Sequence, residues 1–73
     1  MSSICITGIG GYVGLATAYK LAEEGYSVVG IGSSAQAPKN LPEGVVYAGI
    51  DIRDAASLAQ FFTTQQVTTV YHF

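Results

Sequence analysis

The chain has 73 residues, of which 49% are hydrophobic and only 11% charged, and its formal net charge is −2. A chain of this length forms one domain at most and buries a modest share of its surface. Its three basic residues stand singly, so the sequence offers no basic patch of the kind that follows a nucleic-acid backbone. No hydrophobic run approaches the roughly 20 residues of a membrane-spanning helix, and no signal-peptide pattern is visible. We therefore expect a cytoplasmic protein whose partners include neither nucleic acid nor membrane.

Glycines dominate the segment that follows the first hydrophobic run. Residues 3–7 are predicted to form a strand, and residues 7–14 (Thr-Gly-Ile-Gly-Gly-Tyr-Val-Gly) come next. The glycines fit the spacing Gly-x-x-Gly-x-x-Gly at Gly8, Gly11 and Gly14. Because position 13 is Val, the spacing Gly-x-Gly-x-x-Gly does not fit, and no Lys follows as in a Walker loop. The order strand, glycine turn, helix favours a dinucleotide phosphate site over a βα turn that is merely rich in glycine.

Each residue of this turn has an expected role. Gly8 allows the turn, Gly11 allows the pyrophosphate to approach the backbone, and Gly14 allows the helix to pack on the strand. The backbone N–H groups of Tyr12 and Val13 are the expected phosphate donors, because they begin the helix and have no partner within it. The side chain of Tyr12 is expected to pack rather than to contact the ligand.

The remaining chain alternates between strand and helix patterns. The expected elements are a helix over residues 12–24, strands over 27–31 and 45–49 with a loop over 32–44 between them, a second helix capped by Asp54, and a strand over 67–73. The residues expected to face the sheet are Gly14, Ala18 and Leu21 in the first helix and Leu58, Phe61 and Phe62 in the second. This alternation predicts an α/β fold with a Rossmann-type parallel sheet in the order 3-2-1-4. A cofactor crevice is expected at the carboxyl ends of the strands.

The segment at residues 7–14 resembles the opening of the extended short-chain dehydrogenases/reductases, the group that contains nucleotide-sugar epimerases and dehydratases. Residues 49–54 resemble the Gly-Asp-Leu-x-Asp segment of that family, with Ile50 as an extra residue, and residues 70–73 resemble its fourth strand. The resemblance covers the whole chain but only the first part of such an enzyme. It implies that residues 1–73 are an incomplete NAD(P)-binding domain. The family's catalytic Tyr-x-x-x-Lys pair would follow a fifth strand, and no tyrosine here has Lys four residues later.

Position 32 departs from the family pattern. The family places an acidic residue there, which binds the ribose 2′-hydroxyl of NAD. Gly32, followed by Ser33 and Ser34, provides neither that bond nor the repulsion of a 2′-phosphate. The serines can donate to either group, and no Arg stands beside them in the sequence. We expect the cofactor to be NAD or NADP, with a preference for NADP; the alternative is an ordinary Gly-Ser loop.

Five further residues complete the expectations. The resemblance implies that Asp51 binds the adenine amino group, with the backbone of Ile52 beside it, although a plain loop aspartate is the alternative. It also implies that Phe73 flanks the adenosine half of the cofactor. His72 is expected to be a structural core residue rather than an acid–base group, and Cys5 a buried, inert thiol. One His and one Cys cannot form a metal site.

We interpret the chain as the dinucleotide-binding segment of an NAD(P)-dependent epimerase, dehydratase or reductase that acts on a sugar nucleotide or a similar hydroxyl or carbonyl substrate. A second hypothesis is a non-catalytic NAD(P)-binding regulator or redox-sensing module, and a third is a fold fragment that binds nothing tightly. The hydrophobic composition and the open edge of the last strand predict self-association, or pairing with the remainder of an enzyme.

Overall fold

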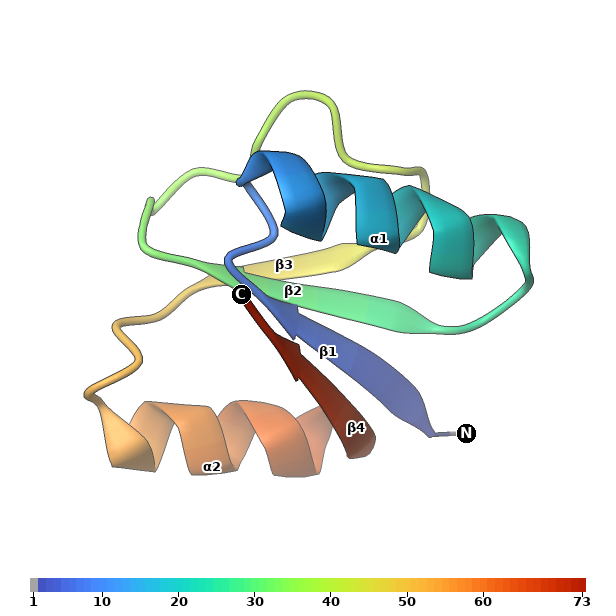
Figure 1. Cartoon of the computed structure of the whole chain (residues 1–73). Helices are drawn as coiled ribbons and strands as arrows, with labels where there is room; N and C mark the ends of the chain where they lie inside the picture. The colour runs from blue at the N-terminus through green and yellow to red at the C-terminus, as the bar shows by residue number, and fades with distance from the viewer. Residues whose placement is uncertain (1) are drawn as a thin grey trace.

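A computed structural model describes residues 2–73 as four parallel strands and two helices (Figure 1). The elements are β1 (Ser3–Thr7), α1 (Tyr12–Glu23), β2 (Val28–Gly32), β3 (Val46–Gly49), α2 (Ala55–Thr64) and β4 (Val67–His72). The sheet has the order β3-β2-β1-β4, and every neighbouring pair is parallel. Figure 1 shows α1 on one face of the sheet and α2 on the other. The α/β Rossmann-type fold and the order 3-2-1-4 are therefore confirmed.

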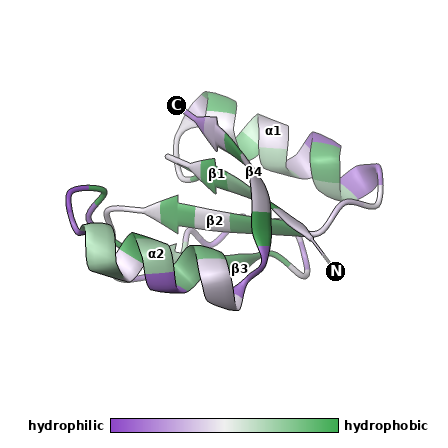
Figure 2. Ribbon diagram, turned by 90° about the horizontal axis from the view of Figure 1, so that it is seen from below, coloured by the Kyte–Doolittle hydropathy of each residue, from purple (hydrophilic) through white to green (hydrophobic). Residues whose placement is uncertain are grey.

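Two hydrophobic clusters fill the spaces between the sheet and its helices. Successive side chains of a strand point to opposite faces, so β1 contributes Ile6 to one cluster and Cys5 to the other. The cluster on the α1 side contains Ile6, Ile9, Ala18, Leu21 and Val28. The cluster on the α2 side contains Cys5, Val29 and Ile31, with partly buried residues of α2 packed against it. In Figure 2 the strands and helices carry most of the green, hydrophobic colour.

The first helix begins and ends at glycines, as expected. Gly11 is its N-cap residue, and the backbone of Gly25 has φ of +90°, which glycine adopts at low cost. Beyond α1, the N–H of Gly25 donates to the carbonyl of Ala22, and the N–H of Tyr26 donates to that of Leu21. This pair of bonds is the Schellman motif that terminates many helices.

The second helix begins at the predicted cap. One carboxylate oxygen of Asp54 accepts the N–H of Ser57 at 3.2 Å, and the other accepts its hydroxyl at 2.7 Å. These bonds lower the pKa of the Asp54 carboxyl. The predicted face of Leu58, Phe61 and Phe62 does contact the sheet, but these side chains are only half-buried and α2 has no buried residue.

The buried cysteine and the element bounds agree closely with the sequence-based expectations. Cys5 is buried, and burial raises the pKa of its thiol to about 11, as expected for an inert group. The element bounds differ by one residue at several ends, and the most useful difference is that β2 continues through Gly32. Neither helix within residues 2–73 combines the length and the hydrophobicity that crossing a membrane requires.

Candidate functional site

The turn after β1 holds its shape through backbone bonds and through the absence of side chains. Gly8 has φ of +70°, a conformation that residues with a Cβ rarely adopt. Its N–H donates to the carbonyl of Ile31 at 2.9 Å, and its own carbonyl accepts the N–H of Gly11 at 3.0 Å. A Cβ on Gly14 would overlap with the carbonyl oxygen of Gly8 and lie 3.2 Å from Cα of Ile9. The turn and the first helical residues can therefore approach each other only with glycines at these positions.

The first amides of α1 point out of this turn without acceptors. The N–H of Leu15 is the first in the helix to find a carbonyl, that of Gly11. Gly11 offers no side-chain cap, and residues 2–73 provide no acceptor for the amides of Tyr12, Val13 and Gly14. Tyr12 and Val13 are 92% and 56% exposed. The expectation that the Tyr12 side chain packs against the core is therefore wrong. The helix thus presents a row of hydrogen-bond donors at the positive end of its dipole.

Beside this turn, a pocket of about 380 Å³ opens at the carboxyl ends of the strands. Its walls come from the ends of β1, β2 and β4 and from the segment after β3. The lining residues are Gly8, Ile31, Gly32, Ser33, Ile50, Asp51, Ile52, Arg53 and Phe73. It brings together six of the predicted cofactor-binding residues: Gly8, Gly32, Ser33, Asp51, Ile52 and Phe73.

Ser34 does not line this pocket, and its polar groups take part in local bonds. Its carbonyl accepts the hydroxyl of Tyr47 at 2.6 Å, and its hydroxyl accepts the N–H of Gln36 at 3.3 Å. The other predicted residues, Gly11, Tyr12, Val13 and Gly14, belong to the helix start, which Gly8 connects to the pocket.

Asp51 forms a solvent-exposed ion pair with Arg53, and both residues line the pocket. Its Oδ1 accepts the backbone N–H of Arg53 at 2.9 Å and Nε at 3.1 Å, while its Oδ2 accepts Nη2 at 2.8 Å. The Arg53 guanidinium lowers the pKa of the Asp51 carboxyl, so this carboxylate is charged at neutral pH. A carboxylate has about four acceptor positions, and these bonds use three of them. Oδ2 therefore retains one position for a further donor.

Arg53 was not anticipated from the sequence as part of the site. It lies far along the chain from Ser33, yet both residues line one pocket because β2 and β3 are adjacent and parallel. The signal was present: loops that follow neighbouring parallel strands end at the same edge of the sheet. A basic residue after the third strand was therefore a candidate neighbour of the loop after the second.

His72 is not a core residue, contrary to expectation. It pairs in register with Thr7, and its Nδ1 lies 2.6 Å from the hydroxyl of Thr7, but the residue is exposed. The reason is that β4 lies at the edge of the sheet, where residues 2–73 provide no further element to cover it. The expectation that its role is structural agrees with the bond between β1 and β4.

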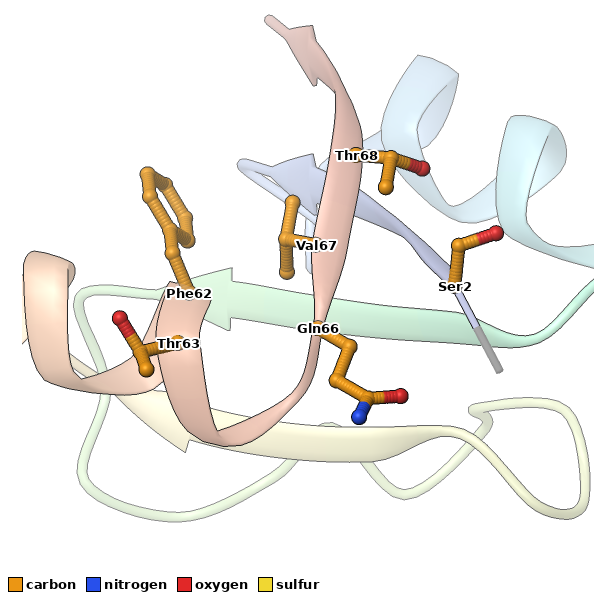
Figure 3. Close-up of a pocket in the computed structure, with 6 residues that line it drawn as sticks. All are labelled: Ser2, Phe62, Thr63, Gln66, Val67 and Thr68. Atoms are coloured by element: carbon orange, nitrogen blue, oxygen red, sulfur yellow. The ribbon is translucent and has the colours of Figure 1, made fainter.

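A second hollow lies at the opposite end of the sheet. It has a volume of about 460 Å³ and is lined by Ser2, Phe62, Thr63, Gln66, Val67 and Thr68. Figure 3 shows these residues at the end of α2, the start of β4 and the N-terminal segment. This lining contains no charged side chain and no helix N-terminus, so it lacks the groups that bind phosphate.

Within residues 2–73, no group of three or more His, Cys, Asp and Glu residues lies close enough together to hold a metal ion.

The family comparison agrees with this geometry. Residues 4–73 match the model of the NAD dependent epimerase/dehydratase family. The chain belongs to this family. A comparison with curated proteins finds no match.

Solved structures of similar fold are several times longer than this chain. UDP-glucose 4-epimerase from Thermotoga maritima, solved with UDP-glucose, has a TM-score of 0.86 and 27% identity over 100% of this chain and 24% of its own. Another UDP-glucose 4-epimerase has a TM-score of 0.86 and 36% identity over 97% of this chain and 22% of its own. The enzyme WbmH from Bordetella bronchiseptica, solved with NAD+, has a TM-score of 0.82 and 32% identity over 100% of this chain and 25% of its own. The chain thus spans about a quarter of these enzymes.

Proposed function

We propose that this chain binds NAD or NADP and forms the cofactor-binding first part of an epimerase, dehydratase or reductase of its family. The observation that carries the proposal is the row of amides at the start of α1, which have no acceptor within residues 2–73 and adjoin a pocket at the carboxyl edge of the sheet. A pyrophosphate is a negatively charged group with several acceptors, and this end of a helix offers donors and a favourable dipole. The absence of a Cβ at Gly11 leaves the backbone accessible to it.

The pocket next to the turn suits the adenosine half of the cofactor. The Oδ2 of Asp51 keeps an acceptor position for the adenine amino group. The N–H of Ile52 has no acceptor within residues 2–73 and lies beside that carboxylate in the chain, ready to donate to a ring nitrogen. Phe73, which is 52% exposed, lines the same pocket and offers an apolar face to the adenosine.

We propose that the chain binds NADP more tightly than NAD. Gly32 adds no negative charge to the pocket, so nothing at that position repels a 2′-phosphate. Arg53 and Ser33 line the same pocket and can donate to a phosphate. The Arg53 bond to Asp51 uses Nε and Nη2, which leaves Nη1 as a donor. Because Asp51 balances part of that charge, the expected preference for NADP is moderate.

The reaction of the longer enzyme is proposed from its relatives. Three of the similar structures are UDP-glucose 4-epimerases, which supports a nucleotide sugar or a similar hydroxyl or carbonyl compound as substrate. The nicotinamide would supply hydride transfer when the cofactor is bound. The residues of this chain would hold and orient the cofactor. The family resemblance implies a catalytic Tyr-x-x-x-Lys pair, and residues 1–73 contain no such pair.

Calorimetric titration of the chain with NAD+ and NADP+ tests the proposal. We expect both to bind, NADP+ more tightly, and we expect Gly11→Val to abolish binding because its side chain would occupy the pyrophosphate position. Ala16→Val is the matched control, since it adds the same side chain to an exposed position of α1 away from the turn. A folded chain that takes up neither dinucleotide would refute the proposal.

A further inference from the structure

The side chain of Tyr47, which comes from β3, lies against Gly32 at the end of β2. Gly32 is the last residue of β2, and a Cβ on it would lie 2.6 Å from the hydroxyl oxygen of Tyr47 and 3.1 Å from its Cε1. The tyrosine therefore fills the space into which a side chain at position 32 would extend. Carboxylate oxygens of an aspartate stand two covalent bonds from Cβ, so the Tyr47 hydroxyl lies at about the distance from Cβ at which such an oxygen would stand.

The position of Tyr47 follows from the sheet. It lies on β3 opposite Gly30, and its ring packs against the hydrophobic cluster on the α1 side. Side chains two residues apart on β2 share one face, so Gly30 and Gly32 both open the α1 side of the strand. Ile9 fills the space over Gly30, and Tyr47 fills the space over Gly32.

The hydroxyl of Tyr47 keeps a free acceptor. Its proton is donated to the carbonyl of Ser34 at 2.6 Å, in a bond that is exposed to solvent. A phenolic oxygen both donates and accepts, so the bond to Ser34 leaves lone pairs for another donor. A ribose 2′-hydroxyl is such a donor, whereas a 2′-phosphate at neutral pH offers chiefly acceptors.

We propose that the Tyr47 hydroxyl accepts a hydrogen bond from the ribose 2′-hydroxyl of NAD and so performs, without charge, the task of the acidic residue in other members of the family. This inference rests on the proposed dinucleotide binding. Because the phenol is neutral, it binds the 2′-hydroxyl without excluding a 2′-phosphate. Cofactor selectivity in this chain is then set by two groups, Tyr47 of β3 for NAD and, for NADP, Ser33 and Arg53 in the loops that follow β2 and β3.

The test measures the dissociation constants of NAD+, NADP+ and the NAD+ analogue that lacks the adenosine 2′-hydroxyl. We expect Tyr47→Phe to weaken NAD+ binding by roughly three- to tenfold, the range of one neutral hydrogen bond. Binding of NADP+ and of the analogue should be unchanged, so the ratio of NADP+ to NAD+ affinity rises by the same factor. Circular dichroism of the variant should match that of the original chain.

Tyr19→Phe is the matched control. The Tyr19 hydroxyl donates to the carbonyl of Asn40, which lies in the same loop as Ser34 but farther along the chain from Gly32. It should change none of the three constants. Equal weakening of all three ligands by Tyr47→Phe would overturn the inference, since it would mean that Tyr47 acts only by holding Ser34. An unchanged NAD+ constant would overturn it as well. Failure of the original chain to bind any dinucleotide would instead refute the proposed function, and this inference with it.

Discussion

The side chains of Thr7 and His72 connect β1 to β4 at the carboxyl ends of these strands. Their side chains share a hydrogen bond of 2.6 Å between neighbouring parallel strands. Thr7 is buried, whereas His72 is exposed. This bond is a side-chain link between β1 and β4 at the residues that directly precede Gly8 and Phe73.

Replacing Thr7 with Val is expected to loosen the end of β4. The variant keeps the shape of the side chain but loses the hydroxyl, at a cost of about 1 kcal/mol. Amide hydrogen exchange should show faster exchange at Tyr71 and His72 and little change in β2. Thr7→Ser keeps the hydroxyl and is the control. If Thr7→Val left exchange in β4 at the original rate, the bond would not hold the strand.

Gly14→Ala is expected to destabilise the fold more than any other single methyl added at the turn. The new Cβ would overlap with the carbonyl oxygen of Gly8, which belongs to the backbone and moves little. Overpacking of this kind typically costs about 1–3 kcal/mol. Urea unfolding measures the loss. Gly10→Ala is the control, because its Cβ would meet only the side chain of Pro38 at 3.4 Å. If both variants had similar stability, the close approach of Gly14 to Gly8 would not be what requires a glycine there.

An aspartate at position 32 should favour NAD only when Tyr47 is made smaller. Gly32→Asp alone forces the Tyr47 ring to shift, so we expect lower stability and a small change in selectivity. Combined with Tyr47→Val, the carboxylate has room to bind the ribose and to repel a 2′-phosphate. The double variant should gain roughly ten- to hundredfold in NAD+ over NADP+ preference, the range of a hydrogen bond to a charged group. Equal selectivity of the single and double variants would show that Tyr47 does not occupy this space.

The 73-residue chain is expected to associate at high concentration. Val70, Tyr71 and Phe73 are 44%, 39% and 52% exposed, and β4 has no second neighbour within residues 2–73. Figure 2 also shows α2 as mostly hydrophobic, although none of its residues is buried. Open strand edges and hydrophobic faces promote pairing between chains. Light scattering should show growth with concentration, and Val70→Lys should reduce it. A monomer with slowly exchanging β4 amides would show that the chain needs no cover.

Sequence patterns predicted most of the fold because they act locally. The glycines at 11 and 25 bound α1, Asp54 begins α2, and the alternation of patterns implies the strand order. The site was predicted less completely, because its walls depend on contacts between distant segments. Arg53 lines the pocket while bonded to Asp51, and Tyr47 contacts Gly32 from the neighbouring strand β3. The exposure of His72 depends on which strands lie beside β4, and a strand's own sequence does not give this.

Amide chemical shifts during a titration with NAD+ show directly whether the pyrophosphate binds the start of α1. In ¹⁵N-labelled chain, we expect the largest saturable shifts at the amides of Tyr12 and Val13, with a second group around Gly32 and Ile52. Saturable binding that leaves the Tyr12 and Val13 amides unmoved, and shifts residues such as Val67 and Thr68 at the opposite end of the sheet, would contradict this expectation.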